Sequence, residues 1–387
     1  MNKNKYRVVI QADSSVKIAE KGEKLSLIYK IDEESIICNF IDIYDQDQHG
    51  TDYHKAIQVE VELREDNIDK AIIKAGGISN LFMTLMSFLT GAGILEPKIF
   101  IAYDITEGIE MREHIQFFYK LGLPGASKRK IDFKRFDSLL TKLGKSNNEI
   151  RLLRAMRWYR KSLTEEDSLD RFANLWFGLE TLNKPLIEKF KLNCKQYNPD
   201  RGHLINLYRL LWSKLIGKKE IPQTVIGIRY LFENYIKHGN KKYQKARKIR
   251  VGLMHGFKNL NEAISESNSL IPDLEKAIRK GVFLLLGIEL KDYNDSGLKS
   301  LTNIPLPYLK TCILIKEADH DKLTSEGKHP YFKDDSVIVQ SKIESDGRTT
   351  FTINYNLKPE FKNDYIPKYR EIYGPEGGLI IKKVEDK

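Results

Sequence analysis

Cysteine is scarce in this chain of 387 residues, with only Cys38, Cys194 and Cys312, and no two of them are closely spaced. That number and spacing exclude a disulfide framework and a four-ligand zinc site. The first residues contain no apolar run followed by a small-residue cleavage site, so we expect no secretory signal. Together these absences favour a reducing compartment, and the protein is expected to be cytoplasmic.

The motifs of several enzyme classes are also missing. The sequence has no HExxH or paired Cys/His metal spacing, no GxxxxGK[ST], no GxGxxG between a strand and a helix, and no GxSxG. We therefore expect neither a metal nor a cofactor. One uncharged stretch, 76–95, has the length of a membrane span. Its serines, threonines and glycines indicate a buried core helix instead, so no membrane partner is expected.

Positive charge is concentrated in the middle of the chain. The net charge of +11 divides into about −6 for residues 1–127, about +19 for 128–258 and about −2 for the rest. A basic segment between mildly acidic ones is typical of a domain that binds a polyanion such as RNA. The alternative is a lysine-rich helical surface that is only solvated.

The residue pattern predicts three regions. Residues 1–124 form an α+β domain, with strands near 6–12, 25–31, 57–63, 98–103 and 114–119 and a helix at 67–89. Residues 125–291 have apolar residues at three- and four-residue spacing and form a helical bundle. Residues 292–387 form a β-rich region with a hairpin turn at 344–347, which can pack back on the first domain.

The expected fold class is therefore α+β and multidomain, with a central all-α bundle flanked by β-rich N- and C-terminal regions. Within the bundle, Asn183 and Pro185 are expected to end one helix. Further helices are predicted at 205–215, 226–235, 241–256 and 271–286.

The residues best suited to chemistry are Arg250 and His255, in the basic run 241–256 (KKYQKARKIRVGLMHG). A guanidinium can grip a phosphate through two hydrogen bonds, and an imidazole can transfer a proton near neutral pH. Cleavage of RNA through its 2′-hydroxyl needs both functions. Residues five apart on a straight helix are separated by about 140° around the axis, so Arg250 and His255 do not automatically share one face. The alternative is that Arg250 is a surface residue and that His255 packs at a helix end before Gly256.

At these residues the chain resembles the HEPN domains, a family of helical bundles whose nuclease members carry RxxxxH. The motif here is Arg250 to His255, followed by Gly256. A second match, 153–182 (LRAMRWYRKSLTEEDSLDRFANLWFGLETL), looks like the HEPN proteins related to the Apea and methylamine-utilisation J groups. The resemblance covers roughly residues 130–290. It implies a homodimer through the helical domain, with both motifs lining one cleft.

The resemblance also assigns roles. Arg250 would hold the scissile phosphate, His255 would be general base or acid, and Glu180 would orient the arginine or the histidine. The residues expected to contact RNA are Arg154, Arg157, Trp158, Arg160, Arg247 and Lys248. Alternatively, Trp158 belongs to the core and the arginines of that helix pair with acidic residues of the following turn, 165–167.

The function expected from this resemblance is a metal-independent endoribonuclease that cleaves RNA, tRNA included, in prokaryotic antiviral defence or a toxin system. The flanking regions would sense a trigger ligand or protein. One departure is Val251, where active members often carry a polar residue. It favours the alternative of an inert HEPN adaptor that binds RNA or protein. A third alternative is a ligand sensor whose helical domain only dimerises.

Overall fold

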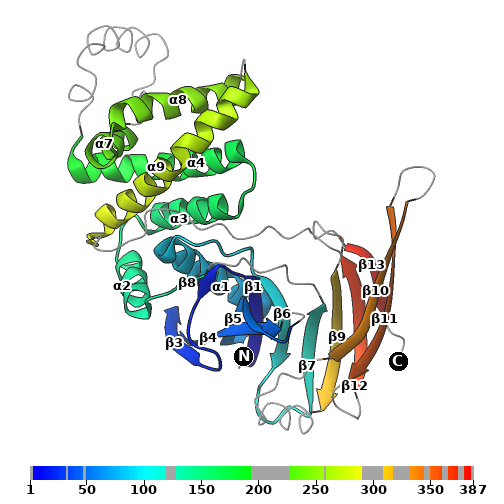
Figure 1. Ribbon diagram of the computed structural model, residues 1–387. Helices are drawn as coiled ribbons and strands as arrows, with labels where there is room; N and C mark the ends of the chain where they lie inside the picture. The colour runs from blue at the N-terminus through cyan, green and yellow to red at the C-terminus, as the bar shows by residue number, and fades with distance from the viewer. Residues whose placement is uncertain are drawn as a thin grey trace, which may run out of the picture.

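The computed structural model describes residues 3–31, 34–46, 49–118, 128–192, 226–256 and 259–289, and five strands between 308 and 384. Figure 1 shows a large sheet with a layer of helices stacked over one part of it. The strands of the N-terminal part are β1 (Asn4–Asp13), β2 (Val16–Lys17), β3 (Lys24–Ile31), β4 (Glu34–Gln46), β5 (Asp52–Glu65), β6 (Lys98–Asp104), β7 (Met111–Phe118) and β8 (Arg129–Lys130). Those of the C-terminal part are β9 (Tyr308–Lys316), β10 (Phe332–Ile343), β11 (Thr349–Pro359), β12 (Tyr365–Tyr373) and β13 (Leu379–Val384).

The main sheet has nine strands in the order β13-β12-β9-β7-β6-β1-β5-β4-β3, and its pairs are antiparallel. Six of these strands come from the first 118 residues, and three come from the C-terminal part. The junction is the pairing of β7 with β9, in which Met111 lies opposite Lys316. The C-terminal region thus packs on the first, as expected.

The predicted fold class, a central all-α bundle flanked by two β-rich regions, is wrong. The chain begins with an antiparallel sheet that is followed by helices, and the later strands extend that same sheet. One continuous core joins residues from the sheet and from the helices. Alternating sequence patterns predict strands but not which strands pair with each other. The sequence therefore indicated two separate β-rich regions, whereas their strands form one sheet. The expected boundaries at 124/125 and 291/292, the helix at 205–215 and the turn at 344–347 lie outside the described residues.

The helix α1 (Ile68–Thr90) lies between the sheet and the other helices. The Asn67 side chain accepts a hydrogen bond from the Lys70 amide at its start, and Gly91 ends it in the left-handed conformation. Phe82 meets Tyr29 and Phe40 of the sheet, with ring centroids 5.2 and 5.5 Å apart. By length and composition α1 could cross a membrane, but 61% of its most apolar stretch of 18 residues is buried inside the protein.

The remaining helices are α2 (Phe133–Gly144), α3 (Glu149–Thr164), α4 (Ser168–Phe190), α7 (Ile226–Tyr235), α8 (Gly239–His255) and α9 (Leu260–Leu286). The helix α4 continues through Asn183 and Pro185 to Phe190, so the predicted end at these residues is wrong. The Asn183 side chain accepts a hydrogen bond from the Gly227 amide of α7, and Leu186 is buried. Packing against α7 thus offsets the backbone hydrogen bond that proline removes.

Candidate nucleic-acid interface

The helix α8 carries the basic run and has one apolar face. Tyr243, Ala246 and Ile249 recur every three residues and are buried, which holds the helix on α7 and α9. At its start, a side chain on Gly239 would place a Cβ 1.8 Å from the Phe232 carbonyl oxygen, so only glycine permits this approach to α7. This packing turns the opposite face of α8 outward.

Cations cover that outward face. Arg247 and Lys248, both predicted to contact RNA, are exposed, and no ion pair joins either to another described residue. Lys242 and Lys245, in contrast, pair with Asp273 and Glu266 of α9. Two unpaired cations are therefore available to a polyanion here.

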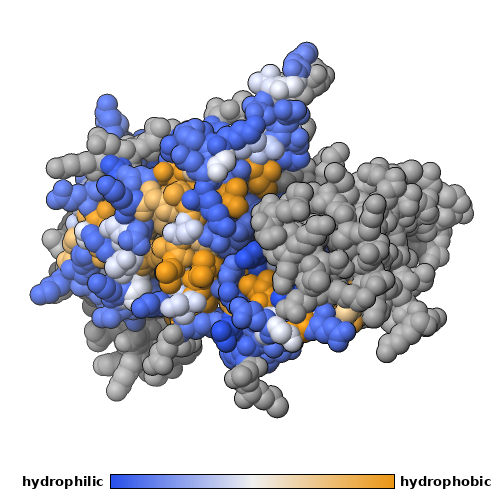
Figure 2. Space-filling view, turned by 90° about the horizontal axis from the view of Figure 1, so that it is seen from below, coloured by the Kyte–Doolittle hydropathy of each residue, from blue (hydrophilic) through white to orange (hydrophobic). Residues whose placement is uncertain are grey.

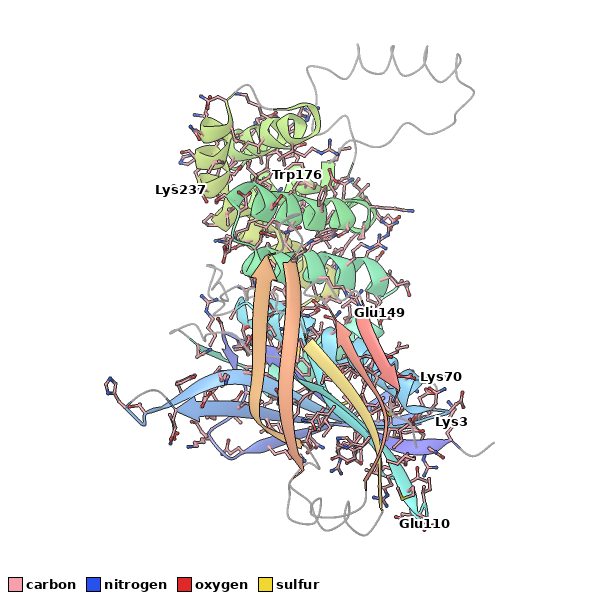
Figure 3. The ribbon with its side chains drawn as sticks, turned by 90° about the vertical axis from the view of Figure 1, so that its right-hand side faces the viewer. Lys3, Lys70, Glu110, Glu149, Trp176 and Lys237 are labelled. Carbon is pink, nitrogen blue, oxygen red and sulfur yellow. The ribbon has the colours of Figure 1, made fainter. Side chains whose placement is uncertain are left out.

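Arg250 is held by Glu180 of α4. The Arg250 Nε donates to Glu180 Oε1 at 3.2 Å, and the Trp176 indole Nε1 donates to the same oxygen at 2.8 Å. Trp176 is buried in the helical layer, where Figure 3 labels it, whereas Arg250 and Glu180 are about one-third exposed. Since Trp176 lies one turn before Glu180, it fixes the carboxylate, and the carboxylate fixes the guanidinium. The structure thus brings together Glu180 and Arg250 as expected.

His255 is the last residue of α8, and Gly256 follows with a φ of 82°. The side chain of His255 lies outside the described residues. Helix α8 is continuous from 239 to 255, so positions 250 and 255 lie about 140° apart around its axis. The two positions therefore do not share one face of the helix. Val251, between them, is 44% exposed.

The helix α3 contributes a second basic face, next to two aromatic rings. Arg154 and Arg157 are exposed, and no ion pair joins them to a described carboxylate, so the predicted alternative of pairing with 165–167 is absent from the described contacts. Trp158 is half-buried and lies against Phe177 of α4 with ring centroids 5.3 Å apart. Lys161 Nζ lies 5.6 Å from the Trp158 ring centroid. Cations here surround an aromatic pair that solvent reaches.

Arg160 does not belong to this face, and the expectation that it contacts RNA is wrong. Its side chain is buried and donates to the Ile94 carbonyl at 2.8 Å, to the Leu95 carbonyl and to Asn80 Oδ1 at 2.6 Å. These contacts attach α3 to α1 and to the segment that follows it. Burial lowers the pKa of Arg160 to about 10.

The helix α4 connects the two basic faces. Phe177 contacts Trp158 of α3, and Glu180, one turn later, contacts Arg250 of α8. We call the residues Arg154, Arg157, Trp158, Phe177, Glu180 and Arg250 the α3–α4–α8 surface. Sequence reasoning missed Trp176 and Phe177. Trp176 lies four residues before Glu180 and Phe177 lies three residues before it. Residues at these spacings are neighbours on the surface of a helix, and this spacing could have identified both.

Comparisons with known proteins add no assignment. No protein-family model, curated protein or solved structure matches this chain. The resemblance to HEPN domains therefore rests on the motifs and stays a prediction. Among the described residues, no group of three or more His, Cys, Asp or Glu side chains could hold a metal ion.

Proposed function

We propose that the protein is a metal-independent endoribonuclease that binds RNA, tRNA included, across the α3–α4–α8 surface. The observation that supports this most directly is the arrangement of Arg250, which is partly exposed and oriented through Glu180 by the buried Trp176. A guanidinium held in one orientation can receive a phosphate with little further ordering.

In the proposed reaction the ribose 2′-oxygen attacks the adjacent phosphorus, forming the O2′–P bond while the P–O5′ bond breaks. A base takes the 2′-hydroxyl proton and an acid gives a proton to the leaving O5′, leaving a 2′,3′-cyclic phosphate and a 5′-hydroxyl. His255 serves as one of these groups, and Arg250 stabilises the negative charge on the phosphorane. A homodimer through the helical domain would bring Arg250 of one chain near His255 of another.

The exposed residues around this site give RNA binding. Arg154, Arg157, Arg247 and Lys248 neutralise backbone phosphates. Phe177, 40% exposed beside Trp158, offers a ring on which a base can stack. The role in prokaryotic antiviral defence or a toxin system, with a trigger bound elsewhere, belongs to this proposal by resemblance.

The test compares wild-type protein with His255→Ala and Arg250→Ala on total RNA and tRNA in excess EDTA. We expect cyclic-phosphate products from the wild type and a loss of at least about 100-fold in each variant. Lys241→Ala is the matched control, since Lys241 is an exposed cation at the other end of α8. Cleavage that survives in His255→Ala would refute the assignment.

The second candidate is an inert adaptor that binds RNA. The exposed Val251 beside Arg250 favours it, because an aliphatic side chain cannot hydrogen-bond to a reacting group. Binding whose affinity falls steeply with salt, without cleavage by any variant, identifies this function.

A further inference from the structure

The strand β3 forms one edge of the nine-stranded sheet, and no described strand pairs with its outer side. Its residues alternate between exposed and half-buried positions along the whole strand. Leu25, Leu27 and Tyr29 turn toward the core. Ile28 turns to the opposite face and is 65% exposed. An unpaired edge with apolar residues on both faces is a site at which another strand can add to a sheet.

The apolar character continues into the neighbouring strand. Ile28 lies opposite Ile37 of β4, which is 38% exposed. Figure 2 views the molecule from below and shows several groups of apolar side chains exposed on this side of the molecule. The edge thus exposes an isoleucine pair on the face that α1 does not cover.

We propose that β3 pairs in antiparallel orientation with β3 of a second copy of this chain, which joins two sheets across a two-fold axis at Ile28. The sequence of the strand, KLSLIYKI, is complementary to itself in this register. On the core side Leu25 lies opposite Ile31 and Leu27 opposite Tyr29. On the other side Ile28 faces its own copy, and Ser26 faces Lys30.

Neighbouring registers are less favourable. Shifting one way places Lys24 opposite Lys30 twice, and like charges directly opposite each other are destabilising. Shifting the other way places Lys30 opposite Ile28 and pairs fewer residues. In the register centred on Ile28, by contrast, no lysine of β3 lies opposite a lysine of the second copy.

The two-fold register makes a specific cross-linking prediction. Cβ atoms of directly opposed residues lie about 4.5–5.5 Å apart, so a cysteine at position 28 can form a disulfide with its copy after a small adjustment. Ile28→Cys is expected to run as a covalent dimer on a non-reducing gel after mild oxidation. The wild type and Ile73→Cys, whose exposed residue lies on α1, are expected to stay monomeric on that gel. This readout reports on β3 alone and does not depend on the proposed nuclease or on pairing of the helical domain.

A second measurement uses charge. By sedimentation velocity, Ile28→Lys is expected to dissociate more readily than the wild type, and an equal mixture of Ile28→Lys and Ile28→Glu is expected to re-associate. Ile73→Lys is the control and should behave as the wild type. Circular dichroism checks that each variant is folded. The proposal is overturned if Ile28→Cys gives no more covalent dimer than Ile73→Cys, or if Ile28→Lys associates as strongly as the wild type.

Discussion

Gly91, the residue that ends α1, provides a sharp test of how the sheet and the helical layer are connected. It adopts a left-handed conformation with a φ of 66°. A Cβ added there would lie 2.9 Å from Arg129 Nη1, 3.1 Å from Arg279 Nη1 and 3.3 Å from the Tyr159 hydroxyl. Arg129 donates to the carbonyls of Thr90 and Gly91, and Arg279 donates to that of Leu89. Gly91→Ala therefore crowds the arginines that cap the C-terminus of α1.

The expected loss of stability has two parts. An alanine in the left-handed conformation costs about 1–2 kcal/mol relative to glycine. Displacing one arginine from its carbonyl costs about 1.5–3 kcal/mol, the usual contribution of a hydrogen bond to a charged group. The free energy of unfolding is therefore expected to fall by about 2.5–5 kcal/mol.

Gly287 is the matched control. It ends α9 with nearly the same backbone conformation, φ 64°, but nothing lies within 4 Å of its added Cβ. Gly287→Ala should cost only the conformational part, about 1–2 kcal/mol. Urea unfolding followed by circular dichroism measures both variants. If the two substitutions cost the same, the arginine cluster at Gly91 contributes nothing and the reasoning is refuted.

Three further predictions concern buried or partly buried groups. Burial raises the pKa of Glu62, but its contacts with Arg7 and Lys5 outweigh that effect, so its pKa lies below the ordinary value and the ionised carboxylate stabilises the fold. That stabilisation is present above about pH 4 and is lost as pH falls further, so Glu62→Gln should lose less stability than the wild type on acidification; equal losses would contradict this. Arg160→Met leaves buried carbonyls without donors and should cost about 3 kcal/mol in urea unfolding, whereas the exposed Arg157→Met should change stability by under about 0.5 kcal/mol. Burial raises the pKa of the Cys38 thiol to about 12, so iodoacetamide at pH 8 should label Cys38 only in urea, and labelling of Cys38 in the native protein, located by peptide mapping, would contradict its burial.

Local periodicity predicted several elements well. The helix predicted at 226–235 coincides with α7, and that at 241–256 matches α8 to within two residues. The strands near 6–12, 25–31 and 57–63 lie within β1, β3 and β5. In each case apolar residues on one face recur with the period of the element, so the signal lies within a short window. The strand β4 was missed, although ESIICNFIDIYDQ is rich in the β-branched residues that favour strands.

The candidate site was partly predictable. Arg250 and Glu180 were chosen from their motifs, and they meet although 70 positions separate them. The burial of Arg160 was not predictable, because its partners lie in α1 and in the segment that follows it, and nothing near Arg160 in the sequence indicates them. The support that Trp176 gives to Glu180 also depends on the orientation of α4 within the helical layer.

The sequence by itself determined that the middle of the chain is basic and helical, and that α8 has a buried apolar face opposite a face of cations, because charge and helical period are local properties. Only the tertiary structure decided that β9 pairs with β7, so that both ends of the chain share one sheet. It also decided that α4 continues through Pro185. The physical reason is the same for both: hydrogen bonding between distant strands and packing between helices depend on partners far along the chain, which no local pattern specifies.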